Sequence, residues 1–388
     1  MICVYKNEQD CCGCTACASI CPKNAITMTV NSKGFKYPVI DQSLCIDCGL
    51  CTSVCNFKVF EPTGKRPDTY AVRHKEEEEV KTSRSGAFFM ALCRYVIEQD
   101  GAVFGCTLTK ELEIKHCSVS SYEKCYIFKG SKYVQSDMGS CFKECAELLK
   151  NDKWVLFSGT GCQVHGLFSF LNKLKAPTDK LVTVDLVCHG VPSPGVWENY
   201  VRVLEARIGD KIISADFRDK ETFGWKEHIE KYVSESGKTY HLKNWTDMFY
   251  RHVMFRPSCY NCKYTTTGRN SDFTIADYWG IGKNAPRFDD NKGVSLVLVH
   301  SDKSRKIFEE IKEYLDIEQT NIKTSMQPQL SKPIWKGYDY NFFWKAYRKN
   351  PEKAIKKYFF PSKIRKVYLS IEKIGKKAIK KVIRLIKK

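Results

Sequence analysis

Apolar runs of two different periods alternate along most of the chain. Short continuous apolar runs bounded by turn residues are typical of buried strands, whereas apolar positions three and four residues apart are typical of helices. Runs of the first kind occupy 69–73, 102–108, 154–158, 181–187 and 294–300. Helical periodicity occupies 86–98, 141–149, 164–172, 194–206 and 304–314. The alternation predicts an α/β core, and antiparallel strands expected between 212 and 241 add an α+β element.

The cysteines divide the chain into parts. Ten of the 20 cysteines lie within residues 1–55, and the other ten are spread over the rest of the chain. A stretch rich in proline and glycine follows Cys55 and is typical of a linker. We therefore expect a small cysteine-rich domain, a linker, a large α/β domain and a C-terminal tail, with bounds 1–58, 59–68, 69–350 and 351–388.

The cysteine content also indicates the cellular compartment of the protein. A chain of 388 residues with 20 cysteines is too long for a small disulfide-stapled scaffold. Its first residues, MICVYKNEQD, lack the apolar region of a secretory signal, and no apolar run is long enough to cross a membrane. We expect a cytoplasmic protein whose reduced thiols serve metal binding or catalysis.

The positive charge is concentrated in the tail. The net charge of the chain is +19, and residues 352–388 alone carry 14 Lys/Arg against two acids. The excess therefore does not indicate nucleic-acid binding. Residues 363–388 place apolar side chains along one helical stripe with lysines elsewhere. Such a helix suits peripheral contact with the anionic inner face of a membrane; docking on a partner and a solubilising role are the alternatives.

One cysteine motif occurs twice in the first domain. Each copy has the spacing C-x2-C-x2-C-x3-C, and Asn56 stands where a proline usually follows the second copy. In this spacing three thiolates hold one 4Fe-4S cluster and the fourth reaches the other cluster. The prediction is one cluster on Cys11, Cys14, Cys17 and Cys55, and a second on Cys45, Cys48, Cys51 and Cys21.

The first domain resembles the bacterial ferredoxins that carry two 4Fe-4S clusters. The alternative, a pair of zinc ribbons, is disfavoured because zinc sites use two C-x2-C pairs for each ion. Cys3 and Cys12 fall outside the repeated spacing, and we assign them no role.

Three small-residue loops in the large domain suit a phosphate-bearing cofactor. Gly159 and Thr160 follow a predicted strand, Ser85 and Gly86 precede a predicted helix, and Lys132 lies in a third loop. Helix starts and tight turns direct backbone N–H groups at anions. Six cationic side chains in the second half of the chain could bind the phosphate of this cofactor or an anionic substrate: Arg218, Lys220, Lys226, Arg251, Arg256 and Arg269. At least half of these are expected to be ordinary surface charges.

Several segments of the large domain resemble the coenzyme F-420 hydrogenase/dehydrogenase beta-subunit family. They occur in the expected order between about residue 69 and residue 344: 130–136, 157–163, 188–193, 217–220, 256–262 and 277–280. The resemblance implies a flavin (FAD) enzyme with an iron–sulfur cluster beside the flavin. The chain departs from the family pattern at Gly161, where proline is usual, and at Ala87, where glycine is common.

The resemblance also implies site residues. Without it, Cys162 and Cys188 could be small buried side chains, and Cys259 with Cys262 a lone C-x2-C pair. With it, these four cysteines are expected to hold a third 4Fe-4S cluster. The expected FAD contacts are Ser85, Gly86, Lys132, Gly159, Thr160 and Asp277. Catalytic residues stay unassigned, and His189 is interpreted as a structural histidine.

The expected function is that of an iron–sulfur flavoprotein oxidoreductase. Clusters move one electron at a time and hydride carriers move two, and a flavin joins the two kinds of chemistry. The partner would be a redox protein or a small electron carrier of the deazaflavin or nicotinamide type, and bacterial members of the family suggest a polysaccharide-synthesis context. Two alternatives stay open: a non-catalytic electron-relay subunit, and an assembly protein without redox turnover.

Overall fold

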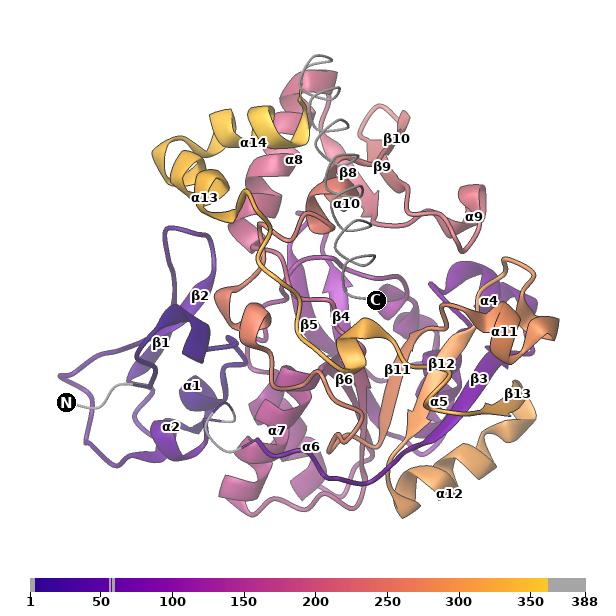
Figure 1. Ribbon diagram of the computed structural model, residues 1–388. Coiled ribbons are helices and arrows are strands. Elements are labelled where there is room, and N and C mark those ends of the chain that lie inside the picture. Colours follow the sequence, from indigo (N-terminus) through magenta and orange to yellow (C-terminus); the bar gives the residue numbers. More distant parts are fainter. Residues whose placement is uncertain (1–3, 56, 58–59, 362–388) are drawn as a thin grey trace, which may run out of the picture.

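The computed structural model describes residues 4–55, 57 and 60–361. In Figure 1 the N-terminal cysteine segment lies at the left, a large sheet with its helices at the lower right, and a smaller group of helices and strands above both. Within the described residues no helix is long and apolar enough to cross a lipid bilayer.

The N-terminal segment is small and pseudo-symmetric. Its two strands form one antiparallel hairpin, and in each motif a short helix follows the first two cysteines and contains the third. The elements are β1 (Ile26–Val30), β2 (Lys36–Ile40), α1 (Ala16–Ile20) and α2 (Leu50–Ser53). The backbone repeats as well as the sequence. Gly13 and Asp47 occupy matching motif positions with φ of 72° and 52°, and Thr15 and Gly49 do so with φ of 69° and 73°.

The large sheet confirms the α/β prediction. Its strand order is β13-β3-β12-β11-β7-β6-β4-β5. The strands are β3 (Asp68–His74), β4 (Ala102–Leu108), β5 (Ile114–Val119), β6 (Val155–Thr160), β7 (Leu181–Leu186), β11 (Phe273–Asp277), β12 (Ser295–Val299) and β13 (Leu315–Thr320). The central strands β4, β6, β7 and β11 are parallel, and the remaining pairs are antiparallel, so the sheet is mixed.

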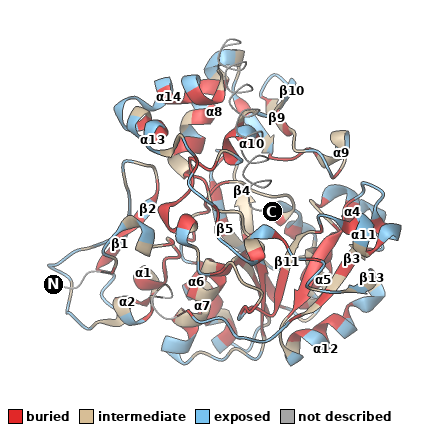
Figure 2. Cartoon of the chain, in the orientation of Figure 1, coloured by how far each residue is buried: buried red, intermediate tan, exposed pale blue. Residues whose placement is uncertain are grey.

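Helices cover both faces of the sheet, which explains the continuous apolar runs of its central strands. Leu156 of β6 faces a core with α5 and α12, whereas its neighbours Val155 and Phe157 face α6 and α7. Figure 2 colours much of the central sheet as buried. The helices are α4 (Glu77–Thr82), α5 (Phe88–Ile97), α6 (Cys141–Lys150), α7 (Gly161–Leu174) and α12 (Asp302–Glu310).

A second body lies on top of the sheet domain in Figure 1. It contains the antiparallel sheet expected between 212 and 241, with strand order β10-β9-β8. Its elements are α8 (Pro194–Ile208), β8 (Ile212–Asp216), α9 (Lys220–Phe223), β9 (Glu230–Ser234), β10 (Thr239–Leu242), α10 (Asn244–Phe249), α13 (Tyr340–Lys349) and α14 (Pro351–Phe359). Helix α14 buries Ile355 and Phe359 in this body, within the segment that the sequence analysis assigned to the tail. The amphipathic stripe at 363–388 lies outside the described residues.

The N-terminal segment is packed tightly between the two larger bodies. Phe35, just before β2, and Tyr37 of β2 share a core with α8 and α13, while Ile20 of α1 packs with α6 and α7. The packing leaves no room at two glycines. A Cβ at Gly166 of α7 would lie 2.9 Å from Cys14 Sγ, and one at Gly195 of α8 would lie 2.7 Å from the Cα of Gly34. The cysteine loops are thus held directly against the sheet domain.

Candidate metal centres and cofactor site

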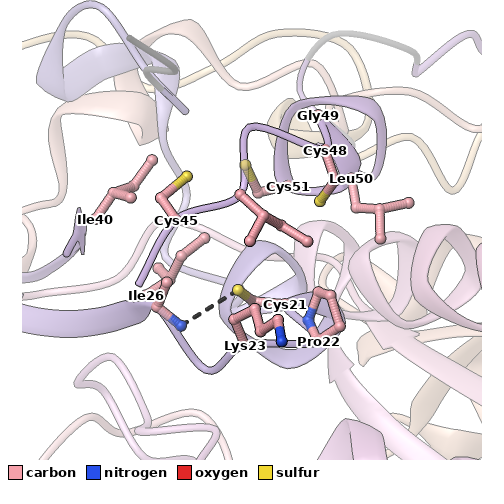
Figure 3. Close-up of a pocket in the computed structure, with 12 residues that line it drawn as sticks. Cys21, Pro22, Lys23, Ile26, Ile40, Cys45, Cys48, Gly49, Leu50 and Cys51 are labelled. Atoms are coloured by element: carbon pink, nitrogen blue, oxygen red, sulfur yellow. Dashed lines mark hydrogen bonds between the residues drawn. The ribbon is translucent and has the colours of Figure 1, made fainter. Parts of the chain in front are cut away.

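The outer cysteine set, which we define as Cys21, Cys45, Cys48 and Cys51, lines one cavity of the N-terminal segment. Figure 3 shows the four sulfur atoms around this cavity, with Cys21 contributed by the first motif and the others by the second. The Ala25 N–H donates to Cys21 Sγ over 3.3 Å. Cys48 is exposed, and the neighbouring Leu44 and Ile46 are 51% and 58% exposed. The structure therefore brings together the four cysteines expected at the second cluster, near the protein surface.

The inner cysteine set, Cys11, Cys14, Cys17 and Cys55, is more deeply placed. Burial raises the pKa of Cys17 well above its usual value, and the nearby thiols of Cys11 and Cys55 raise it further. Cys14 and Cys17 belong to the same buried cluster, which also contains residues of α6 and α7. Cys55 of the second motif thus lies near Cys17 of the first motif, as the crossed partition requires; Cys51 of the outer set also lies near Cys17.

The sheet-edge cysteine set, Cys162, Cys188, Cys259 and Cys262, lines a second cavity. Cys162 stands at the start of α7 directly after β6, and Cys188 follows β7. Because β6 and β7 are parallel neighbours, their carboxyl ends meet at one edge of the sheet. The 3-10 turn η3 (Pro257–Asn261) brings Cys259 over that edge.

Backbone N–H groups donate hydrogen bonds to two thiols of this set. Gly190 N–H donates to Cys188 Sγ over 3.3 Å, and Val191 N–H donates to Cys259 Sγ over 3.5 Å. Burial raises the pKa of Cys188 to about 12 and that of Cys262 to about 11. Burial therefore favours the neutral thiols, and a bound cationic centre would supply the positive charge that stabilises thiolates.

Cys12, to which the sequence analysis assigns no role, also lies at this second cavity. It lines the cavity together with the sheet-edge cysteine set. Its thiol is in hydrogen-bond contact with the thiols of Cys14 and Cys162. The one sequence feature that could have drawn attention to Cys12 is its position inside the first motif, between Cys11 and Gly13.

The residues expected to contact FAD fall into two places. Thr160 lines the cysteine cavity, where its hydroxyl lies 3.2 Å from Cys162 Sγ, and Gly159 precedes it in β6. Ser85 and Gly86 lie elsewhere, beside β12: the Ser85 hydroxyl donates to the Val294 carbonyl over 2.5 Å. A Cβ at Gly86 would lie 2.2 Å from the Val72 carbonyl oxygen, so this glycine is required by close packing. Ala87, with φ of 61°, occupies the conformation that glycine favours.

Asp277 lies in a buried cluster of charges and aromatic rings near Ser85. We call it the cationic aromatic cluster, and its members are Arg84, Arg218, Lys220, Trp225, Asp277 and Trp279. Arg218 Nη1 donates to Asp277 over 2.5 Å, and Lys220 Nζ donates to the Ser85 carbonyl over 3.1 Å. Burial alone would raise the pKa of Asp277, but Arg218 and Arg84 outweigh it and lower that pKa.

The cluster carries more positive charge than its one carboxylate neutralises. Burial and the nearby Arg84 lower the pKa of Lys220 to about 7. The Nε atoms of Arg84 and Arg218 are buried and have no hydrogen-bond partner among the described residues. Trp225 and Trp279 stack with ring centroids 4.9 Å apart, and Trp279 is 40% exposed. Such a site fits an anionic ligand with an aromatic ring.

Lys132 and His189 have partners of their own. Lys132 Nζ donates to the carbonyls of Ile127 and Lys129, and burial lowers its pKa to about 8. The neighbouring residue, Tyr133, contacts Arg218, so this loop borders the cationic aromatic cluster. His189 lines the cysteine cavity, and its Nε2 lies 2.7 Å from His252 Nε2. Burial and His252 lower the pKa of His189 to about 4, which leaves the ring neutral near pH 7.

Comparison with known proteins gives two family matches. Residues 152–325 match the C terminus of the coenzyme F420 hydrogenase/dehydrogenase beta subunit, and residues 10–59 match the 4Fe-4S dicluster domain. No curated protein sequence matches the chain. Among solved structures, a chain of the F420-reducing NiFe hydrogenase complex from Methanosarcina barkeri, derivatized with xenon, is 17% identical, with a TM-score of 0.46 over 77% of this chain and 93% of that chain. The two matches identify a 4Fe-4S dicluster domain at the N-terminus and, over residues 152–325, the C-terminal domain of the coenzyme F420 hydrogenase/dehydrogenase beta subunit.

Proposed function

We propose that this protein is an iron–sulfur flavoprotein oxidoreductase that moves electrons between a one-electron partner and a two-electron carrier. The observation that supports this best is the grouping of the cysteines. Eight cysteines from distant segments line two cavities in sets of four, and each set is one that the sequence predicts for a 4Fe-4S cluster. Cys17 of the inner cysteine set lies near Cys51 of the outer set, and Cys14 contacts Cys12 of the second cavity, so three clusters would form a continuous series.

The motif spacing favours clusters over zinc. Zinc sites use two C-x2-C pairs for each ion, whereas the first domain repeats C-x2-C-x2-C-x3-C, the spacing typical of 4Fe-4S clusters. The outer and sheet-edge cysteine sets each surround a common cavity.

Electrons would enter or leave the series at the outer cysteine set. Its exposed Cys48, with exposed Leu44 and Ile46 beside it, would bring a cluster close to a docked redox protein. The other end of the series is the sheet-edge cysteine set, which lies in the domain that carries the family match. This order assigns the dicluster domain to the one-electron side of the reaction.

The two-electron side requires a cofactor such as FAD, which exchanges both single electrons and hydride. The cationic aromatic cluster has the chemistry for it: Arg84, Arg218 and Lys220 would hold an anionic group, and Trp279 would cover a ring. The carrier that exchanges hydride with FAD would be a deazaflavin or nicotinamide.

Anaerobic purification of the full chain, followed by iron and flavin analysis, tests this function. We expect about 12 iron atoms per chain, four for each cluster, and one FAD. About 12 iron atoms without flavin, before or after incubation with FAD, would instead indicate an electron-relay subunit. A protein with about 8 iron atoms would contradict the three-cluster series.

The crossed partition of the N-terminal cysteines gives a prediction for single variants. Cys55→Ala should damage the cluster of the first motif, and Cys21→Ala should damage that of the second, because each thiol lies with the other motif. Electron paramagnetic resonance of the reduced proteins measures which signal is lost. Cys17→Ala and Cys51→Ala serve as references, since each belongs to the set of its own motif. If Cys55→Ala and Cys51→Ala removed the same signal, the partition would be wrong.

The cationic aromatic cluster gives a prediction for flavin binding. Arg218→Ala should weaken FAD retention by about 10- to 100-fold, because a hydrogen bond to a charged group contributes about 1.5–3 kcal/mol. Iron content should not change. Arg287→Ala is the matched control, since Arg287 is an exposed arginine paired with Glu318. Fluorescence of released flavin measures the retention, and equal retention in both variants would locate the flavin elsewhere.

A further inference from the structure

A fifth cysteine lies among the four of the sheet-edge cysteine set. Cys12 comes from the dicluster domain, is 6% exposed and lines the same cavity. Its thiol contacts Cys14 of the inner cysteine set and Cys162 of the sheet-edge cysteine set. It is therefore a direct side-chain link between residues predicted to ligate two different clusters.

The backbone around Cys12 is held in place on both sides. Gln135 Nε2 donates to the Cys12 carbonyl over 2.9 Å, and Arg256 Nε donates to the Cys11 carbonyl over 2.8 Å. Arg256 Nη1 also donates to Gln135 Oε1 over 2.9 Å, so the two side chains that bond to this backbone are bonded to each other.

The same arginine fixes the opposite wall of the cavity. The Arg256 N–H donates to the Val191 carbonyl over 2.9 Å, and the Cys259 N–H donates to the Arg256 carbonyl over 2.9 Å. The loop that carries Cys12 and the loop that carries Cys259 are thus positioned by one residue. The position of the Cys12 thiol follows from this shared anchor.

The geometry gives the Cys12 thiol two sulfur neighbours, Cys14 and Cys162. A cysteine S–H group is a hydrogen-bond donor. Cys12 is therefore placed to donate a hydrogen bond to a ligand sulfur on either side. Hydrogen bonds to cluster sulfurs are among the factors that set reduction potentials. A donor raises the potential because it stabilises the more negative, reduced state.

We propose that Cys12 is a non-ligating thiol that bridges the inner and sheet-edge clusters. It donates a hydrogen bond to a ligand thiolate, raises the potential of that cluster, and provides the contact through which an electron passes between the two. In that step one cluster loses one electron and the other gains it, while the Cys12 proton and all bonds stay in place. The proposal rests on the three-cluster function above, and Cys12 acts in it as a positioning residue.

Two substitutions in the full chain, purified anaerobically, test the proposal. Cys12→Ala removes the donor, and Cys12→Ser keeps one. We expect both proteins to retain the wild-type iron content. In redox titrations followed by electron paramagnetic resonance, Cys12→Ala should lower the midpoint potential of one cluster, and Cys12→Ser should restore much of the shift. After rapid reduction of the outer cluster, the sheet-edge cluster should be reduced more slowly in Cys12→Ala than in wild type.

Cys145→Ala is the matched control, because Cys145 is a fully buried cysteine of α6 outside the three sets. It should change neither the potentials nor the rate. Loss of about four iron atoms in Cys12→Ala would show that Cys12 is a ligand and overturn the proposal. Full iron with unchanged potentials and rates would overturn it while leaving the proposed function intact. A wild-type protein with only about eight iron atoms would overturn both.

Discussion

Replacing Cys262 by serine is expected to lower the iron content from about 12 to about 8 atoms per chain, because one 4Fe-4S cluster should be lost. Cys262 lies in the sheet-edge cavity with Cys188 and Cys259, in surroundings that already disfavour charge on sulfur. A serine hydroxyl is a poor substitute for a thiolate ligand to iron. Iron analysis and the loss of one electron paramagnetic resonance signal measure the effect.

The same variant separates the two halves of the proposed reaction. Reduction of flavin through the dicluster domain should stop, whereas direct hydride reduction of the flavin should stay partly active. Cys117→Ser is a suitable control, because Cys117 is a half-buried cysteine of β5 that lies in neither cysteine cavity. Zinc in place of iron in the wild-type protein would contradict the cluster assignment. The four cysteines would then form a structural zinc site.

The parts of the structure that local sequence dictates were predictable. Apolar runs located β4, β6 and β7 to within about two residues, because strands buried on both faces need continuous apolar side chains. The repeated cysteine spacing predicted which thiols share a cluster; Cys21 lines a cavity with the outer set and Cys55 lies near Cys17, and the clusters themselves stay a prediction. Both signals are contained in a few consecutive residues.

Long-range contacts were not predictable in the same way. Arg256 bonds to the Cys11 carbonyl across 245 positions of the sequence, and Arg84 meets Asp277 with no local motif to indicate it. Cys12 lies inside the first motif, whose repeated spacing does not include it, so the pattern indicated no role for it. Its role depends on Cys162, which only the fold brings near.

The turn expected at Gly159 and Thr160 shows how a local pattern can mislead. Strand β6 continues through Thr160, and the Thr160 N–H and hydroxyl both donate to Gln163 Oε1 in a capping box at the start of α7. The small residues let the strand pass directly into a helix that presents Cys162 to the cavity. The glycine-rich pattern thus serves a cysteine position, and FAD contact at Thr160 stays a prediction.

A pair of glycine variants should measure how strongly the dicluster domain is clamped to the rest of the protein. Gly13 and Gly49 have nearly equal φ values of 72° and 73°. A Cβ at Gly49 would meet none of the described residues within 4 Å, whereas one at Gly13 would lie 2.8 Å from Arg256 Nη1 and 2.9 Å from Gln135 Nε2. The two alanine variants therefore share the backbone strain and differ in the contact with Arg256.

Backbone strain alone should be tolerated in this motif. Asp47 and Thr15 hold the matching left-handed positions of the opposite copies with φ of 52° and 69°. Gly49→Ala should therefore cost about 1–2 kcal/mol of stability, and lower the unfolding temperature by only a few degrees.

Gly13→Ala should have a much larger effect, because the Arg256 guanidinium cannot move aside cheaply. Arg256 is 1% exposed, donates to the carbonyls of Cys11 and Lys36, and stacks 4.2 Å above the Tyr37 ring. Displacing it would break hydrogen bonds of a buried cation that are each worth about 1.5–3 kcal/mol. We expect Gly13→Ala to lower the unfolding temperature by about 10 °C or more and to slow electron passage to the sheet-edge cluster. Thermal unfolding of the anaerobic proteins followed by circular dichroism measures the difference, and equal shifts for the two variants would show that Arg256 does not clamp the domains.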